Sequence, residues 1–346
     1  MAKQTDAPLQ AFKRALQAGT PDRCYLFWGE ESYLLRHYLG QLQKKLVDPL
    51  TEEFNFHRLN QENFSMDTLL DSVENLPMLA ERTLIVVEDV DLFRLAEQDR
   101  ERLIKLLWDL PEHCCLVFVF ETIAYRPDRR QKKLYEALEK NAASVEFARQ
   151  NQRDLTTWIS RHMQALGKGI SQALCVYLME RIGGDMTALA GEIGKIAAYA
   201  AGPEITRQDI DAVTEPVLDA VVFEMTDALG AGAYEDALGK LEDLFLLQQE
   251  PIAILGAIGA QLRRLSAART LLDAGKGEAT LMQLYGLRDF TARKTVAAAR
   301  RLSPDFCRAA ANLVVETDAE LKTSFDDPKR LLELLICRLA QEAQHA

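Results

Sequence analysis

A turn at residues 29–36 lies where nucleotide phosphates bind in many α/β proteins. It follows a short apolar run, residues 24–29, and opens a segment with helical spacing. The phosphate-binding motif GxxxxGK[ST] needs a second glycine for close backbone approach, a lysine for the phosphates and a hydroxyl for magnesium. After Gly29 these positions hold Leu34, Leu35 and Arg36. The position suits a P-loop, but the required side chains are absent.

Acidic residues near this turn argue further against a bound nucleotide. Glu30 and Glu31 would lie where phosphates should sit, and like charges at that distance repel. A second acidic pair, Glu88 and Asp89, ends a run similar to the magnesium-binding strand of ATPases, but without a P-loop no triphosphate would accompany the metal. A buried strand ending in solvated acids is the simpler interpretation. The sequence therefore predicts no catalytic residue, no metal and no cofactor.

An apolar tetrapeptide, Leu76-Pro77-Met78-Leu79, follows a segment with helical spacing and precedes a buried strand. Proline stops a helix, so Met78 and Leu79 should fall in a connection, where exposure is the default. Two adjacent large apolar side chains in a loop suit insertion into a partner's pocket, and methionine adapts well to such surfaces. The alternative is that both side chains fold back onto their own core.

The charges are unevenly distributed. A net charge of -11 argues against a protein that coats DNA over its whole surface. Residues 260–301 nevertheless carry nine basic residues against three acidic ones, a net of +6. These charges fit a solvated helix face, although some could follow nucleic-acid phosphates. Two aromatic residues beside basic ones could stack on a base, and for the first of them core packing is the simpler interpretation. The resulting DNA-contact candidates are Phe290, Arg293, Lys294, Lys322 and Phe325.

The elements that position these residues change character along the chain. Before residue 150, short apolar runs alternate with segments of helical spacing, which predicts an α/β domain over residues 1–149 with a mostly parallel sheet covered on both faces. After it only helical spacing remains. We expect two all-α domains, residues 150–213 and 214–346, with Thr206 as a helix N-cap, so the chain is helix-dominated overall. Strands are expected at residues 24–29, 54–59, 83–89, 115–121 and 144–148.

Several function classes are excluded by simple features. No apolar run reaches the roughly 18 residues that span a bilayer, and the N-terminus has no signal-peptide core, so we expect a cytoplasmic protein without membrane contact. The six cysteines form no CxxC pair and the five histidines are scattered, which predicts free, mostly buried thiols and no zinc site.

Five segments, in the same order along the chain, resemble the delta subunit family of bacterial DNA polymerase III. The matching segments are residues 29–35, 75–93, 128–138, 184–213 and 317–336. The resemblance implies an AAA+ fold without working ATPase motifs in the first two domains, and a third domain that joins a helical collar. It also implies partners: the beta sliding clamp, the gamma/tau and delta-prime loader subunits through the collar, and primer–template DNA.

The same resemblance implies site residues. The family binds the clamp through an apolar pair at the tip of a first-domain helix, then holds one clamp interface open. By the flanking Ala-x-Arg pattern this pair maps to Met78 and Leu79, with Leu76 and Pro77 beside them and Arg82 as a polar neighbour. The family carries aromatics at similar collar positions, commonly tyrosine where this chain has Phe325.

Three alternatives remain. An active AAA+ ATPase with a degenerate P-loop would bind ATP. A delta-prime-like subunit usually carries a cysteine-rich zinc module and a Ser-Arg-Cys element, and neither occurs in this sequence. A helical scaffold unrelated to replication would explain the composition equally well, but not the ordered motif matches.

Overall fold

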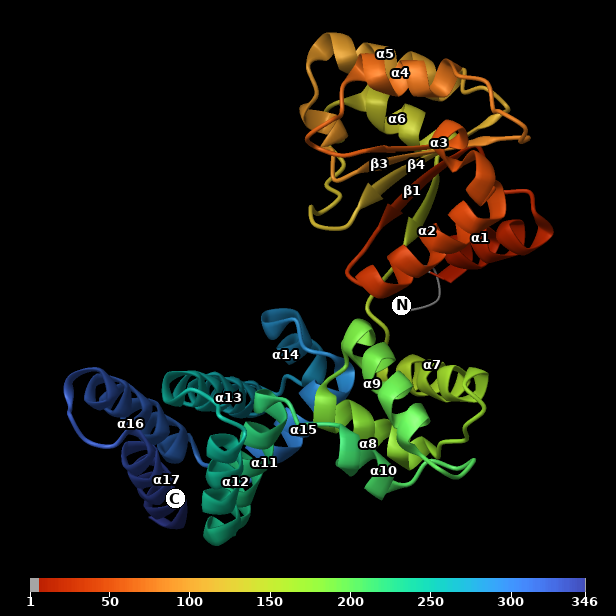
Figure 1. Ribbon diagram of the computed structural model, residues 1–346. Coiled ribbons are helices and arrows are strands. Elements are labelled where there is room, and N and C mark those ends of the chain that lie inside the picture. Colours follow the sequence, from red (N-terminus) through yellow and green to blue (C-terminus); the bar gives the residue numbers. More distant parts are fainter. Residues whose placement is uncertain (1–5, 346) are drawn as a thin grey trace. The chain divides into compact units, whose positions relative to one another are not determined.

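The computed structural model describes residues 6–345 and separates the chain into two compact units (Figure 1). The boundary falls between Arg149 and Gln150. We call the part before it unit 1 and the part after it unit 2. Each unit has hydrophobic clusters of its own, as expected for a chain too long for one average core.

Unit 1 is built on a five-stranded sheet in the order β2-β3-β4-β1-β5, in which every neighbouring pair is parallel. The strands are β1 (Cys24–Trp28), β2 (Phe56–Leu59), β3 (Thr83–Glu88), β4 (Cys114–Phe120) and β5 (Ala143–Glu146). The five predicted strands and their parallel arrangement are confirmed. The strand boundaries differ from the predicted ones by one or two residues, and at β2 the reason is that Phe54 and Asn55 belong to a short helix.

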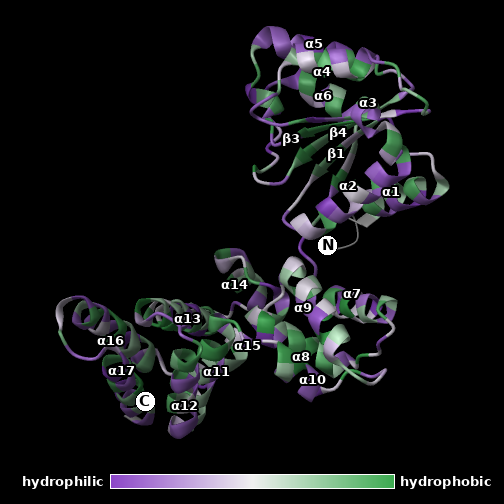
Figure 2. Ribbon diagram, viewed as in Figure 1, coloured by the Kyte–Doolittle hydropathy of each residue, from purple (hydrophilic) through white to green (hydrophobic). Residues whose placement is uncertain are grey.

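Helices cover both faces of this sheet, with α4, α5 and α6 on one side and α1 and α2 on the other (Figure 1). Leu84 and Val86 of β3 pack with α1 and α2, whereas Ile85 and Val87 pack with α4, α5 and α6. Successive side chains of a strand point to opposite faces, which explains the continuous apolar runs (Figure 2). The helical elements of unit 1 are α1 (Asp6–Ala18), α2 (Ser32–Leu46), η1 (Pro49–Thr51), α3 (Glu52–Asn55), α4 (Met66–Glu74), η2 (Leu92–Arg94), α5 (Glu97–Trp108) and α6 (Lys132–Asn141).

Unit 2 is helical, which confirms the predicted loss of strands after residue 150. Its first helices are α7 (Gln152–Ala165), α8 (Gln172–Ile182), α9 (Met186–Tyr199) and α10 (Arg207–Val213). The predicted N-cap is confirmed: the Thr206 hydroxyl accepts a hydrogen bond from the Asp209 N–H, and the Asp209 carboxylate accepts one from the Thr206 N–H. This reciprocal pair satisfies two backbone donors that the helix leaves open.

The remaining helices share one hydrophobic cluster. They are α11 (Leu218–Ala231), α12 (Tyr234–Leu246), α13 (Pro251–Asp273), α14 (Glu278–Tyr285), α15 (Asp289–Ala299), α16 (Pro304–Thr323) and α17 (Pro328–His345). The Arg181 guanidinium donates hydrogen bonds to Thr214, which lies between α10 and α11. The division of unit 2 at residue 213 stays a prediction.

Two further expectations concern membranes and thiols. Over residues 6–345, no helix combines the length and the apolarity that crossing a bilayer requires. The six cysteines are free thiols, and four of them are buried. Cys337 is exposed, because it lies on a face of α17 that points away from the cluster formed by Leu335, Ile336 and Leu339.

Candidate functional site

The connection between α4 and β3, residues 75–82, exposes the apolar side chains that the sequence singled out. The Ser65 hydroxyl caps α4, and the helix ends at Glu74, three residues before Pro77. Leu76 is 77% exposed, Met78 46% and Leu79 88%. The exposure expected for Met78 and Leu79 is therefore observed. Their contact with a partner stays a prediction.

The buried Asn55 side chain holds this connection in place. Its Oδ1 accepts a hydrogen bond from the Met78 N–H, and its Nδ2 donates one to the Met78 carbonyl, both at 2.8 Å. The same Nδ2 also donates to Thr51 Oγ1. Both polar groups of the Met78 backbone are therefore bound by one amide whose residue is 0% exposed. Asn55 was not among the site residues predicted from the sequence. Its position at the end of a short polar stretch before β2 is a weak signal, and its partner lies 23 residues away.

The backbone next to this contact is strained. Leu79 has a φ of 53°, a left-handed conformation that is uncommon for residues other than glycine. Such a conformation costs on the order of 1–3 kcal/mol and persists only where its surroundings fix it. The two hydrogen bonds to Met78 supply that constraint on one side of Leu79. The strained backbone at Leu79 therefore lowers the stability of the fold slightly, while it holds an exposed leucine in one orientation.

Arg82 fixes the other end of the connection. Its guanidinium donates hydrogen bonds to the backbone carbonyls of Pro21, Glu112 and Cys114. The family resemblance predicted that Arg82 is a polar neighbour of Met78 and Leu79. The structure places it at the base of the connection, where its donors hold the chain's own backbone.

The turn at Gly29 is packed against the chain itself. Gly29 has a φ of 133°, and a Cβ at this position would lie 2.3 Å from the carbonyl oxygen of Phe147. The Glu31 N–H donates to that same oxygen at 2.9 Å. Glu30 pairs with Arg149 at 2.9 Å, which offsets part of the negative charge that the sequence predicts at this turn. A second barrier to phosphate binding is that a backbone N–H of the turn is already bound.

Other polar groups that a nucleotide would need are also occupied. Arg36, at the position of the P-loop hydroxyl, pairs with Glu121 at 2.6 Å. Glu88 pairs with Arg58 at 2.8 Å. The interpretation of Glu88 and Asp89 as merely solvated acids is therefore wrong, because both carboxylates bind within the chain.

Asp89 organises the loop after β4. Its carboxylate accepts hydrogen bonds from the N–H groups of Glu121, Thr122 and Ile123 and from the Thr122 hydroxyl. Desolvation by burial opposes its ionisation, but these hydrogen bonds outweigh that effect and hold the Asp89 pKa below its ordinary value. Asp89 also has a left-handed backbone, with a φ of 54°.

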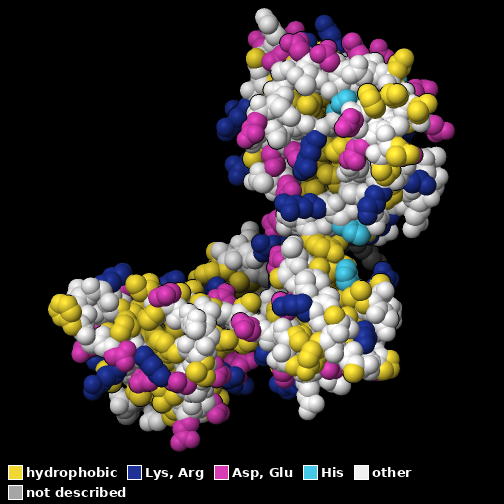
Figure 3. Space-filling view, in the orientation of Figure 1, with side chains coloured by type: hydrophobic (Ala, Val, Ile, Leu, Met, Phe, Trp, Pro, Cys, Tyr) yellow, Lys and Arg dark blue, Asp and Glu magenta, His cyan; other side chains and the backbone are white. Residues whose placement is uncertain are grey.

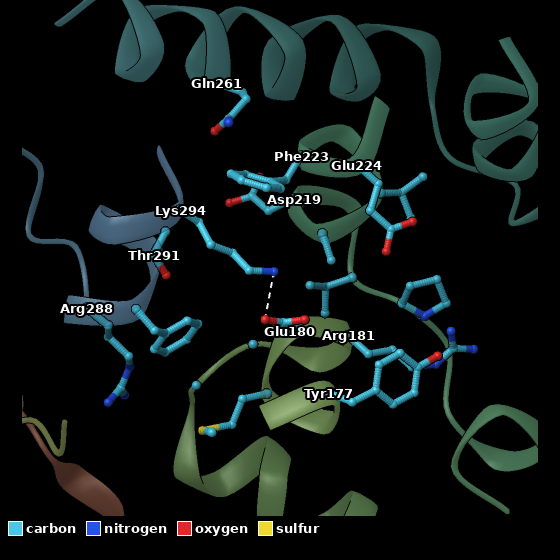
Figure 4. Close-up of a pocket in the computed structure, with 18 of the residues that line it drawn as sticks. Tyr177, Glu180, Arg181, Asp219, Phe223, Glu224, Gln261, Arg288, Thr291 and Lys294 are labelled. Carbon is cyan, nitrogen blue, oxygen red and sulfur yellow. Dashed lines mark ion pairs between the residues drawn. The ribbon is translucent and has the colours of Figure 1, made fainter. Parts of the chain in front are cut away.

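In unit 2, five of the nine basic residues of segment 260–301 form ion pairs with acidic residues. Ion pairs join Arg264 to Asp219, Arg269 to Asp273, Arg293 to Asp289, Lys294 to Glu180 and Arg301 to Asp227. Phe290 is half-buried and lines a cavity of about 630 Å³ between α8, α11, α13 and α15. Figure 4 shows Lys294 and Glu180 facing each other across this cavity, 2.7 Å apart. Phe290, Arg293 and Lys294 are thus engaged within unit 2.

The turn between α16 and α17 presents the last candidate. Phe325 is fully exposed, and Lys322 pairs with Asp318 at 2.6 Å. Asp326 and Asp327 follow the aromatic ring directly. An exposed aromatic bordered by acids is suited to stacking rather than to holding phosphates.

Comparisons with known proteins point to the same family in both units of the chain. Two family models match, described as DNA polymerase III, delta subunit, over residues 25–148, and as DNA polymerase III delta subunit, C-terminal domain, over residues 219–339. The chain is 24% identical over 331 residues to DNA polymerase III subunit delta of Bacillus subtilis (strain 168), covering 94% of this chain and 95% of the relative. It is 24% identical over 332 residues to a probable DNA polymerase III subunit delta of Aquifex aeolicus (strain VF5), covering 93% and 92%.

A solved structure shares the fold. The chain resembles a DNA clamp loader delta protein of Bacillus subtilis with a TM-score of 0.72 at 22% identity, and the match covers 96% of this chain and 99% of that one. The α/β unit followed by helices is therefore an arrangement already seen in an experimental structure.

Proposed function

Because the chain belongs to the family of DNA polymerase III delta subunits, we propose that it binds the sliding clamp and holds the ring open while a clamp loader places it on primed DNA. One observation supports this above the others. The exposed pair Met78 and Leu79 stands on a connection whose backbone is fixed by Asn55. A pre-organised apolar tip binds with less loss of conformational entropy than a mobile one.

The proposed mechanism uses binding energy alone. A closed ring opens when a ligand binds its open form more tightly than its closed form, since a ligand shifts an equilibrium only by its differential affinity. Met78 and Leu79 are the proposed anchors, with Pro77 and Leu76 beside them. Hydrolysis of ATP is assigned to other subunits. The occupied backbone at Gly29 and the Arg36–Glu121 pair argue against nucleotide binding here, so the alternative of an active ATPase is disfavoured.

Further partners follow from this role. The helices after residue 213 would form a collar with the gamma/tau and delta-prime subunits, and Phe325 would meet the primer–template junction. Such a protein works in the cytoplasm at replicating DNA and has no catalytic activity of its own.

Replacing both anchors by serine tests the proposal. Burying the exposed parts of Met78 and Leu79 contributes roughly 2–4 kcal/mol, and anchors of this kind often dominate an interface. Met78→Ser with Leu79→Ser should therefore weaken binding of the organism's clamp by about thirty- to a thousandfold, measured by calorimetry. Leu166→Ser, at an exposed leucine of unit 2, is the matched control and should leave the Kd unchanged. A loss below about threefold in a folded double variant would move the clamp site elsewhere.

A further inference from the structure

Exposed apolar side chains in unit 1 are concentrated in two chain segments. Among its described residues, unit 1 exposes six large hydrophobic side chains. Three of them belong to the connection after α4. Two others, Leu50 in η1 and Phe54 in α3, are 91% and 53% exposed. Trp108 is the sixth and stands apart on α5. Single exposed hydrophobics are ordinary on protein surfaces, whereas contiguous groups mark binding sites.

The Asn55 side chain joins the two segments. Its amide binds Thr51 and both polar backbone groups of Met78 at 2.8 Å. Each of these three residues has an exposed apolar chain neighbour: Leu50 precedes Thr51, Phe54 precedes Asn55, and Leu79 follows Met78. The hydrogen bonds therefore bring both groups of side chains to one region. Figure 3 shows hydrophobic side chains gathering on the α3 side of unit 1.

We propose that Leu50 and Phe54 form a second anchor segment of the same partner-binding surface, clasped to the Met78–Leu79 segment by Asn55. This inference rests on the proposed function, because it assigns both segments to the sliding clamp. The binding surface is then composed of two segments that the chain brings together, rather than a single tip. Its partner must offer apolar pockets for both segments.

The charges beside the two segments define the partner further. Glu52 and Glu53 lie between Leu50 and Phe54, Glu74 directly precedes the connection, and Glu81 lies within it. All four are exposed. An apolar surface with an acidic rim fits a partner face whose pockets are bordered by lysine and arginine, and such rim charges act mainly on the association rate and are screened by salt. Binding to the clamp should therefore weaken as ionic strength rises.

The test compares three full-length variants against the organism's sliding clamp by calorimetry. Leu50→Ser with Phe54→Ser should raise the Kd about ten- to a hundredfold. Leu166→Ser should leave it within about twofold. Met78→Ser with Leu79→Ser reports on the proposed function separately. The melting temperature of each variant is measured alongside. Because Leu50 and Phe54 are exposed, as are Met78 and Leu79, the two double variants should keep the wild-type melting temperature.

The outcomes separate the two ideas. Loss of affinity in both double variants supports a two-segment surface. An unchanged Kd for the Leu50/Phe54 variant, with strong loss in the Met78/Leu79 variant, overturns this inference and leaves the proposed function standing. An unchanged Kd in both overturns both. For the rim, Glu53→Gln with Glu81→Gln should reduce the salt dependence of association, and an association rate insensitive to salt in the wild type overturns the basic-rim assignment.

Discussion

Three polar side chains of unit 1 have the same task, which is to fix loop backbone. Asn55 binds Met78, Arg82 binds three carbonyls at the base of the same connection, and Asp89 binds three successive N–H groups after β4. Left-handed backbone accompanies two of these contacts: Leu79 directly follows Met78, and Asp89 is itself left-handed. Buried polar side chains that satisfy backbone groups rigidify a loop. The exposed apolar tip is thus a defined surface rather than a flexible one.

The exposed pair Met78 and Leu79 was predictable from the sequence, but Asn55, which fixes it, was not. Pro77 and the adjacent large apolar pair are local signals, so the exposure of Met78 and Leu79 could be predicted. Asn55 could not, because its role depends on a hydrogen bond across 23 residues and an asparagine there also fits a turn. The ion pair between Glu30 and Arg149 was not predictable either, because the two residues are far apart in the sequence.

The occupied Gly29 turn leads to a prediction about nucleotides. The Glu31 N–H is bound to Phe147, and Arg36 is paired with Glu121, so phosphates would have to displace both contacts without a P-loop lysine to compensate. Titration with Mg-ATP should therefore give no saturable heat and no rise in melting temperature, since a ligand that binds the folded state would stabilise it. Saturable binding at micromolar ATP that disappears in Arg36→Ala would contradict this expectation.

At the scale of elements, strands and helices were predictable because their apolar periodicity is local. Helix α3 was missed because its four residues are too few to show a helical period. The sheet order was not predictable, since it depends on pairing between distant segments. The basic segment shows the same limit. Its helices were expected, but three of its ion pairs join it to acidic residues of α8 and α11 that lie far earlier in the chain. Arg264 pairs with an acid 45 residues before it, Arg301 with one 74 residues before it, and Lys294 with a still more distant one. Because these three acids lie outside the segment, they offset about half of its net charge of +6.

The turn between α16 and α17 carries an element-scale prediction. The Ser324 N–H donates to the Glu320 carbonyl, and the Asp326 N–H donates to the Ser324 hydroxyl, so hydrogen bonds hold the backbone on both sides of Phe325. Stacking of an exposed aromatic ring on a base stabilises a complex by about 1–3 kcal/mol. Phe325→Ala should reduce clamp loading on primed DNA about tenfold or more, measured with a loader reconstituted around the full chain.

Two controls make this prediction specific. Clamp affinity of Phe325→Ala should match the wild type, and Phe325→Tyr, which keeps an aromatic face, should retain loading. Because the ring is fully exposed, neither substitution should lower the melting temperature. Normal loading by the alanine variant would remove Phe325 from the DNA interface.

At the scale of the whole molecule, the chain separates its proposed tasks between two units. The hydrophobic clusters on the two faces of the sheet lie entirely before residue 150, and the buried residues of the cluster shared by α11–α17 all lie after residue 220. Every residue of the proposed clamp surface belongs to unit 1. The helices proposed for the collar belong to unit 2. Clamp binding and subunit assembly should therefore be separable.

This separation gives the last prediction. A fragment of residues 1–149 contains both hydrophobic clusters of unit 1 and the hydrogen bonds of Asn55 to Thr51 and Met78. Its 149 residues suffice for an independent core. It should bind the clamp with a Kd within about threefold of the full chain, measured by calorimetry, because all proposed contacts are retained. It should fail to join the other loader subunits in gel filtration, because the collar helices are missing. The fragment with Met78→Ser and Leu79→Ser is the control and should lose clamp binding. A fragment that melts cooperatively but binds more than about tenfold more weakly would show that unit 2 contacts the clamp directly, and the division of tasks between the units would then be wrong.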